Sequence, residues 1–142
     1  MRFLLDTNAI SEPQRPRPDP AFANWFANQP LETLYLSVLT FGELSRGAVS
    51  LPPSRRRSDL EAWITEGLSV FGPRILPVDT RVALAWAQVS AAHRAARRTV
   101  NPVDELIAAT ALTHHLAVVT RNARDFEASG CEVVVPWGVG GK

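Results

Sequence analysis

Short apolar runs alternate with helical patterns along this chain, and this alternation constrains its fold more than any other feature. The runs are too short for helical periodicity, so we predict them to be buried strands. They lie at residues 2–6, 34–36, 75–78, 116–120 and 132–135. Because strands that alternate with helices favour a mostly parallel sheet, the chain is predicted to be an α/β protein.

The segments between these runs carry apolar residues three and four apart, which is typical of amphipathic helices. We predict helices at about residues 20–29, 38–51, 60–68, 80–89 and 102–115. Ser37, Asp79 and Asn101 stand where helix N-caps are expected, and the proline after Asn101 strengthens that start signal. The last six residues, 137–142, are expected to fray.

The size and composition of the chain fit one globular domain, so we expect residues 1–142 to form a single unit. The chain has 142 residues, of which 46% are apolar and 20% charged. A membrane span is not expected, because no apolar stretch approaches the roughly 18 residues it needs. Cys131 is the only cysteine, which excludes an internal disulfide and favours a reduced, cytoplasmic setting.

Arginine supplies almost all of the positive charge. Of the 15 basic side chains, Lys142 is the one lysine and the other 14 are arginines. The net charge of +1 does not by itself indicate a nucleic-acid-binding protein. Guanidinium groups bind phosphate through two parallel hydrogen bonds, although an arginine-rich genome explains the excess equally well.

Acidic side chains occur where predicted strands end and helices begin. Asp6 ends the first strand, Glu43 lies mid-helix, one turn past Ser37 at the end of the second strand, and Asp104 lies in the first turn of the last helix. Asp125 follows the strand that ends at Thr120. Ligand sites in parallel sheets form beyond the carboxyl ends of strands, so these acids are expected at one edge. Because clustered carboxylates repel one another, they favour a hard cation, Mg²⁺ or Mn²⁺.

Each acid also has a purely structural interpretation. Asp6 can cap a helix. Glu43 lies three residues after Thr40, as in a capping box, or it pairs with Arg46 on a solvated face. Asp104 occupies the third position of its helix, where the helix dipole favours an anion. The sequence leaves both interpretations open for each residue, and the joint placement of the acids favours a site.

Four segments in order carry a resemblance to a known family. They are FLLDTNAISE at 3–12, TFGELSRG at 40–47, NPVDELIAATA at 101–111 and VVTRNARDF at 118–126. Together they resemble the motifs of PIN-domain proteins, within that group those of the VapC and FitB type. The resemblance implies a PIN-like three-layer α/β/α sandwich around a mostly parallel sheet. It also implies a homodimeric, Mg²⁺-dependent endoribonuclease toxin that a partner antitoxin holds silent in a higher assembly.

The resemblance also implies roles for individual residues. Asp6 and Asp104 would be the principal Mg²⁺ ligands, and Glu43 would complete the acidic cluster. Some relatives have a fourth acid where this chain has Asn122, and the nearest carboxylate here is Asp125. If Asp125 does not reach the site, a single metal is favoured. Residues expected to hold the carboxylates or the phosphate by hydrogen bonds are Thr7, Asn8, Thr120 and Asn122.

The mechanism implied is metal-assisted hydrolysis of an RNA phosphodiester. A water molecule oriented by Asp6, Glu43 or Asp104 would attack phosphorus in line. The basic residues expected to contact the RNA backbone are Arg15, Arg17, Arg46 and Arg121.

Two other functions compete with this hypothesis. A haloacid-dehalogenase-like phosphatase also begins with a strand that ends in Asp, but it needs a second acid two residues later and a lysine beside the phosphoryl group. Here Asn8 holds the first position and Lys142 is the only lysine, so this class is disfavoured. A degenerate nuclease that acts as a binding or regulatory module is the second alternative. Asn122 favours it, and the three principal acids argue against it.

Overall fold

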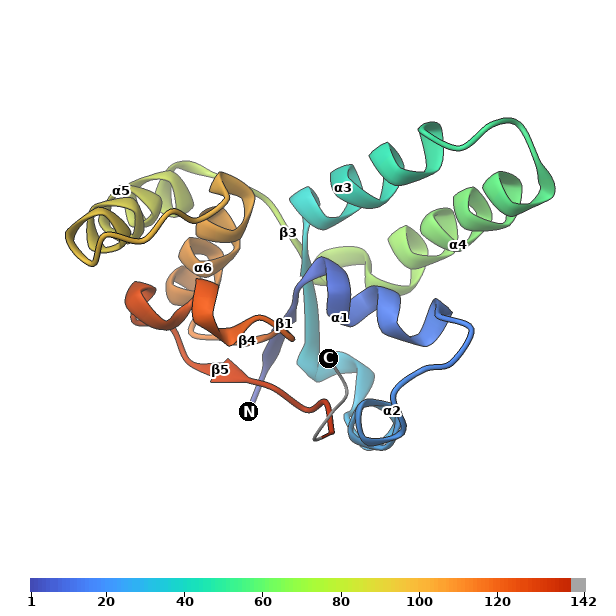
Figure 1. Cartoon of the computed structure of the whole chain (residues 1–142), viewed down its shortest axis with the longest axis horizontal. Helices are drawn as coiled ribbons and strands as arrows, with labels where there is room; N and C mark the ends of the chain where they lie inside the picture. The colour runs from blue at the N-terminus through green and yellow to red at the C-terminus, as the bar shows by residue number, and fades with distance from the viewer. Residues whose placement is uncertain (139–142) are drawn as a thin grey trace.

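Parallel strands form the centre of the protein in the computed structural model, which describes residues 1–138 (Figure 1). The strands are β1 (Phe3–Leu5), β2 (Leu34–Ser37), β3 (Ile75–Leu76), β4 (Ala117–Val119) and β5 (Val133–Val134). Their order across the sheet is β3-β2-β1-β4-β5, and each neighbouring pair is parallel. The predicted parallel sheet is confirmed. Four of its strands are shorter than the apolar runs that indicated them, and β2 is one residue longer.

Helices cover both faces of the sheet. They are α1 (Thr7–Ser11), α2 (Pro20–Ala27), α3 (Val38–Val49), α4 (Arg55–Phe71), α5 (Thr80–Ala95) and α6 (Pro102–His114). In Figure 1, α5 and α6 lie on one side of the strands and α1 to α4 on the other. This arrangement confirms the three-layer α/β/α sandwich. Within residues 1–138, no helix has the length and apolar character needed to cross a membrane.

The alternation of side chains along β1 divides the core into two halves. Phe3 and Leu5 pack in a cluster with residues of α1 to α4, whereas Leu4 packs in a second cluster with residues of α5 and α6. Leu4 and Leu5 are fully buried. Because burial of one leucine side chain contributes about 1.5–3 kcal/mol, both faces of this central strand stabilise the sandwich. The core therefore holds the carboxyl end of β1 in a fixed place.

Polar side chains set the starts of the longer helices. The side-chain oxygens that accept a hydrogen bond from a first-turn backbone N–H belong to Asp6, Asp19, Ser37, Ser54, Asp79 and Asn101. The predicted caps at Ser37, Asp79 and Asn101 are confirmed. Capping satisfies N–H groups that have no partner inside the helix, which contributes about 1 kcal/mol at each end.

Two parts of the chain differ from the sequence-based expectation. The segment after Asp6 forms α1 and a short 3₁₀ turn, Glu12–Gln14, before the proline-rich connection begins. The prediction that residues 137–142 fray is wrong for Trp137, which is buried and packs on Phe22 with ring centroids 4.6 Å apart. The prediction is also wrong for Gly138, whose backbone N–H donates to Asp19 Oδ2 at 3.1 Å. Residues 139–142 of that segment lie outside the described residues.

Candidate active site

Asp6 lies at the carboxyl end of the central strand and begins the helix that follows it. Its Oδ1 accepts a hydrogen bond of 2.8 Å from the Ala9 backbone N–H, and its own N–H donates to the Val119 carbonyl at 3.1 Å. The Thr120 side chain also hydrogen-bonds to its carboxylate. Burial raises the pKa of Asp6, the hydrogen bonds from Thr120 and Ala9 oppose that rise, and the charge of Glu43 adds to it. Asp6 is thus a buried carboxylate held in one orientation.

Asp104 reaches the same place from the start of α6. It is partly buried, and burial is the largest reason that its pKa rises from 3.8 to about 6. The negative charges of Asp6, Asp125 and Glu43 raise the pKa of Asp104 further, in that order. The sequence predicts these four acids at one edge of the sheet. In the structure, Asp104 lies close enough to the other three for their charges to raise its pKa.

Glu43 closes the cluster from α3. The Thr7 hydroxyl donates a 2.6 Å hydrogen bond to Glu43 Oε1, which joins the first turn of α1 to α3. Glu43 Oε2 lies 4.0 Å from Arg46 Nη2. A pocket of about 230 Å³ opens among these groups; the residues that line it are Asp6, Thr7, Asn8, Glu43, Asn101 and Asp104.

Asn122 and Asp125 stand beside this pocket as a hydrogen-bonded pair. The Asn122 backbone N–H donates to Thr120 Oγ1 at 3.0 Å, and its side-chain amide donates to Asp125 Oδ2 at 2.6 Å. Asp125 lies close enough to raise the pKa of Asp104. The sequence leaves open which of the two completes the cluster; in the structure, the amide holds the carboxylate in place.

The structural interpretations of the acids are confirmed in part. Asp6 does cap α1, and Glu43 does pair with Arg46. The capping box from Thr40 to Glu43 is wrong, because Ser37 caps α3 and Thr40 Oγ1 is buried without a hydrogen-bond partner among residues 1–138. Asp6 therefore both caps α1 and belongs to the acidic cluster.

The donor set fits a hard divalent cation. Every charged donor in the cluster is a carboxylate oxygen, and the charge of Glu43 raises the pKa of both Asp6 and Asp104. Across the described part of the chain, no three His, Cys, Asp or Glu side chains are already arranged as a metal shell. The cluster therefore supplies the charge and donor type for a cation, and Asp6 and Asp104 are the acids that combine burial with mutual repulsion.

Glu105, next to the site in sequence, belongs to a different part of the molecule. Its Oε2 lies 2.7 Å from His93 Nδ1, and Trp86 Nε1 donates to its Oε1 at 3.3 Å. Both Glu105 and His93 are buried. This pair joins α5 to α6, so Glu105 helps to hold the helix that positions Asp104.

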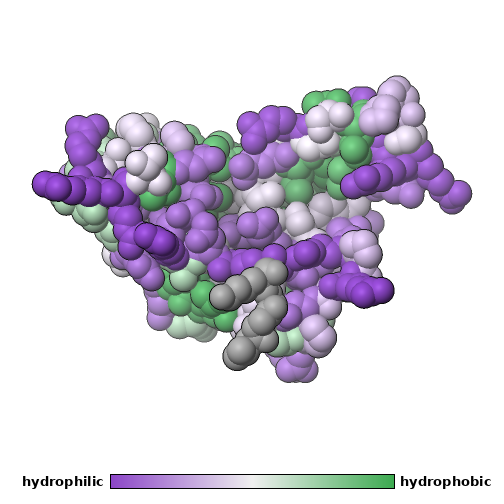
Figure 2. Space-filling model, viewed as in Figure 1, coloured by the Kyte–Doolittle hydropathy of each residue, from purple (hydrophilic) through white to green (hydrophobic). Residues whose placement is uncertain are grey.

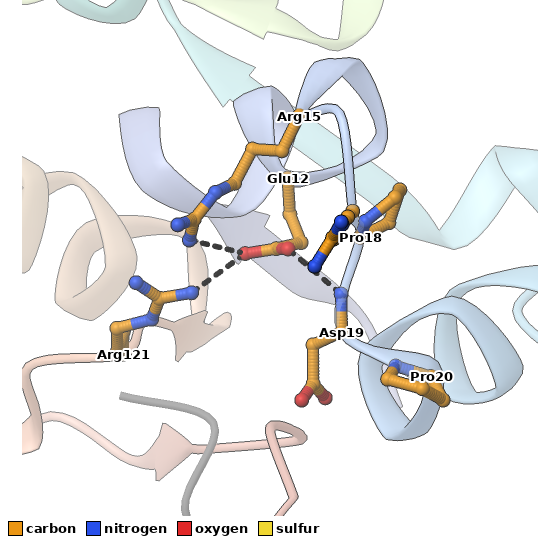
Figure 3. Close-up of a pocket in the computed structure, with 7 residues that line it drawn as sticks. Glu12, Arg15, Pro18, Asp19, Pro20 and Arg121 are labelled. Atoms are coloured by element: carbon orange, nitrogen blue, oxygen red, sulfur yellow. Dashed lines mark hydrogen bonds and ion pairs between the residues drawn. The ribbon is translucent and has the colours of Figure 1, made fainter.

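Sequence reasoning missed Glu12, the acid that ends α1. Only 1% of its surface is exposed, and its carboxylate accepts hydrogen bonds from Arg121 at 2.7 Å and the Asp19 backbone at 2.9 Å (Figure 3). It also accepts a hydrogen bond of 2.8 Å from the Trp137 ring N–H. Arg15 lies 3.4 Å from the same carboxylate. Its position at the end of the motif at residues 3–12 is the only signal in the sequence that points to it.

Known proteins match this chain over nearly its full length. The PIN domain family matches residues 3–129. VapC ribonuclease Y4jK of Sinorhizobium fredii is 36% identical over 136 residues, which cover 95% of this chain and 97% of that protein. Toxin FitB of Neisseria gonorrhoeae is 38% identical over 136 residues, which cover 95% and 98%. The crystal structure of FitAcB from Neisseria gonorrhoeae matches with a TM-score of 0.90 at 38% identity and covers 95% of this chain and 98% of that chain.

Proposed function

Because this chain belongs to the PIN-domain family, we propose that it is a metal-dependent endoribonuclease and the toxin component of a toxin–antitoxin pair. The observation that carries the proposal is the convergence of Asp6, Glu43, Asp104 and Asp125, whose mutual repulsion and burial raise the pKa of Asp104 to about 6. The similarity to a protein named VapC ribonuclease supports RNA as the substrate, and the similarity to Toxin FitB supports the toxin assignment.

Asp6 and Asp104 would hold the divalent ion, for which Mg²⁺ and Mn²⁺ suit the oxygen-only donor set. When bound, such an ion stabilises negative charge that develops on a phosphate and makes water a stronger nucleophile. The Ala9 N–H and Thr120 fix the Asp6 carboxylate beforehand, so little side-chain freedom is lost when a substrate binds.

Glu43 is suited to orient the attacking water and to accept its proton. Thr7 fixes Oε1 at 2.6 Å, which leaves the second oxygen to act. Oε2 is 4.0 Å from Arg46 Nη2, beyond hydrogen-bond distance, so it remains available to a water O–H. A carboxylate that is held at one oxygen and open at the other is the arrangement that general-base catalysis requires.

Asp125 is the fourth acid of the proposed site, and Asn122 is its positioning residue. The 2.6 Å hydrogen bond from the Asn122 amide holds the Asp125 carboxylate at one oxygen. The effect of Asp125 on the pKa of Asp104 supports its nearness to the cluster. This chain has Asn122 where some relatives have an acid, but Asp125 still provides a carboxylate beside the site. This carboxylate argues against a degenerate nuclease.

The same proposal includes a homodimer and a complex with a cognate antitoxin, in the cytoplasm. Large apolar side chains that remain exposed support protein partners; examples are Val49, Leu68 and Leu84, at 59%, 47% and 67% exposure. Figure 2 shows hydrophobic side chains gathered between α3 and α4, while hydrophilic residues cover the middle of the viewed face. Light scattering of the purified chain, with and without a co-expressed partner, measures both assemblies.

The test of the proposed function is cleavage of total RNA by purified protein from which any co-purifying partner has been removed. Discrete fragments with Mg²⁺ or Mn²⁺, and none with EDTA, are expected. Fragments that persist in EDTA would refute the role of the metal. Specific binding of RNA without cleavage in either metal would favour the binding module instead.

A further inference from the structure

A second pocket, of about 340 Å³, lies at the other end of α1 from the acidic cluster. Three arginines line it: Arg15, Arg17 and Arg121. The remaining wall comes from Glu12 and from the segment at residues 18–20. Prolines at two of the three positions in that segment fix the backbone φ angle, so the wall is stiff. Figure 3 shows Arg15 and Arg121 both directed toward the same oxygen of the Glu12 carboxylate, Oε1.

The buried Glu12 fixes the arginines, and the two positive charges of Arg15 and Arg121 exceed its single negative charge. Its Oε1 accepts from Arg121, Trp137 and, at 3.4 Å, Arg15, and its Oε2 accepts from the Asp19 backbone. Burial opposes its ionisation, but the hydrogen bonds from Trp137 and Asp19 and the charges of Arg15 and Arg121 hold the pKa of Glu12 below its ordinary value. Glu12 is therefore an anchor for two guanidinium groups.

Arg121 is the most constrained of the three arginines. Besides its 2.7 Å bond to Glu12, its guanidinium carbon lies 5.3 Å from the centre of the Trp137 ring. Its Nε is buried and has no hydrogen-bond acceptor among the described residues. A guanidinium carries five N–H donors, so donors remain after the bond to Glu12 is formed. Such a group binds phosphate with little further loss of side-chain freedom.

The pocket has more positively charged side chains available to a ligand than negatively charged ones. The Asp19 carboxylate accepts, through Oδ2, from the backbone N–H groups of Phe22 at 2.9 Å and Gly138 at 3.1 Å, and these bonds, with a smaller contribution from the charge of Arg121, lower its pKa. Half of the Arg15 side chain is exposed, and Arg17 is exposed and has no ion-pair partner within residues 1–138. The open rim of the pocket is thus positive.

The pocket adjoins the acidic cluster along α1 and along the segment that follows β4. Asp6 caps the start of α1 and Glu12 caps its end, so five residues of helix separate them and their Cα atoms lie about 9 Å apart. Arg121 directly follows Thr120, whose side chain hydrogen-bonds to Asp6. A strand of nucleic acid that crosses the cluster therefore passes this pocket within a short distance.

We propose that Arg15, Arg17 and Arg121 form a subsite that binds a backbone phosphate of the RNA next to the bond that is cut. The inference rests on the proposed endoribonuclease function, which makes RNA the ligand. It adds the residues that position the RNA strand in the active site. Because the interaction is with the sugar–phosphate backbone, the subsite contributes affinity for RNA of every sequence and selects none.

The test measures binding of RNA, without metal, so that it does not depend on cleavage. The protein is titrated in EDTA with a fluorescent single-stranded 12-nucleotide RNA of mixed sequence, at several salt concentrations. The variant is R15Q/R17Q, which removes two exposed guanidinium groups and leaves the buried bond between Glu12 and Arg121 intact. The matched control is R2Q/R81Q, with the same loss of charge at the opposite edge of the sheet, where Arg2 and Arg81 contact the end of α6.

R15Q/R17Q is expected to weaken RNA binding about tenfold at low salt, since hydrogen bonds to charged groups are the strong ones. The slope of log affinity against log salt should fall by about 0.7 for each RNA phosphate that the variant no longer binds, and R2Q/R81Q should change neither quantity. Equal RNA affinity in the two variants, or no RNA binding by the unmodified protein, would overturn the subsite. So would arginine-dependent binding of a heptaglutamate peptide in place of RNA, which would identify an acidic protein segment as the ligand. A protein that binds RNA through these arginines but does not cut it would refute the endoribonuclease and keep the subsite.

Discussion

Replacing Asp104 with Asn removes one negative charge from the acidic pocket and leaves the shape of the side chain almost unchanged. Burial and three neighbouring acids raise the pKa of Asp104 from 3.8 to about 6. The folded state therefore binds this proton more tightly than the unfolded chain does. The stability that the proton contributes is complete below about pH 4 and is lost as the pH rises through about 6. Asn carries no charge at any pH, so the variant does not lose this stability.

The size of the effect follows from the shift in pKa. Two units correspond to about 3 kcal/mol for a fully buried group, and the partial exposure of Asp104 reduces this to about 1–2 kcal/mol through solvent screening. The variant also loses a favourable interaction with the α6 dipole, which costs about 0.3–1 kcal/mol. The cost of a charge that is buried and repelled by its neighbours is the larger of the two effects. At pH 8 in EDTA, Asp104→Asn should therefore raise Tm by about 2–4 °C.

The assay combines thermal denaturation with cleavage of RNA. Tm is measured in EDTA from pH 4 to pH 8 for the unmodified protein, for Asp104→Asn and for Asp59→Asn, a control at an exposed acid of α4. The gain in Tm should disappear near pH 4, and Mg²⁺ should stabilise the unmodified protein more than the variant. Cleavage by Asp104→Asn should fall to background. A variant that cuts RNA at the normal rate and melts at a lower temperature at pH 8 would show that Asp104 only stabilises the start of α6.

Three further predictions concern the surroundings of the acids. Thr7→Val removes the 2.6 Å hydrogen bond to Glu43 and should slow RNA cleavage about tenfold. Its Tm should fall by no more than a few degrees. An unchanged rate of cleavage would contradict the proposed orientation of Glu43. Asn122→Asp adds a negative charge beside Asp125 and should tighten Mg²⁺ binding, measured by calorimetry. The same variant should have a lower Tm at pH 8 in EDTA, because the acids repel one another. A higher Tm would show that they do not. Glu12→Gln should lower the free energy of unfolding, measured from urea titrations, by about 1–3 kcal/mol. The reason is that Arg121 loses its charged partner. Equal stability of the variant and the unmodified protein would mean that solvent replaces the ion pair.

The elements with local signals could be predicted from the sequence. Apolar runs indicate the strands, and caps such as Ser37 and Asn101 indicate the starts of helices, because these patterns depend on neighbouring residues. The convergence of Asp6 and Asp104 was also predictable, since Asp6 ends β1 and Asp104 begins a helix that leads into a parallel strand, and both places lie at the carboxyl edge of the sheet. The bounds of the strands depend on pairing with neighbouring strands, so four strands are shorter than their apolar runs and β2 extends one residue past its run, to Ser37.

The missed features depend on interactions between distant parts of the chain. Glu12 bonds to residues 109 and 125 positions away, and no periodic pattern indicates such a pair. The proline-rich sequence after Glu12 indicates an irregular connection, although it forms the wall of the pocket that Arg121 completes. The glycines after Trp137 favour a frayed end, and packing of this ring against Phe22 outweighs that local tendency.

The central claim is that the acidic cluster at the end of β1 cuts RNA with a divalent cation. Cleavage of a purified RNA in Mg²⁺ by Asp6→Asn, beside Asp59→Asn at the same protein concentration and with matched circular dichroism spectra, tests it most directly. We predict that Asp59→Asn cuts at the rate of the unmodified protein and that Asp6→Asn does not cut above background. Equal cleavage by the two variants would contradict the claim, because the most buried acid of the cluster would then have no part in the reaction.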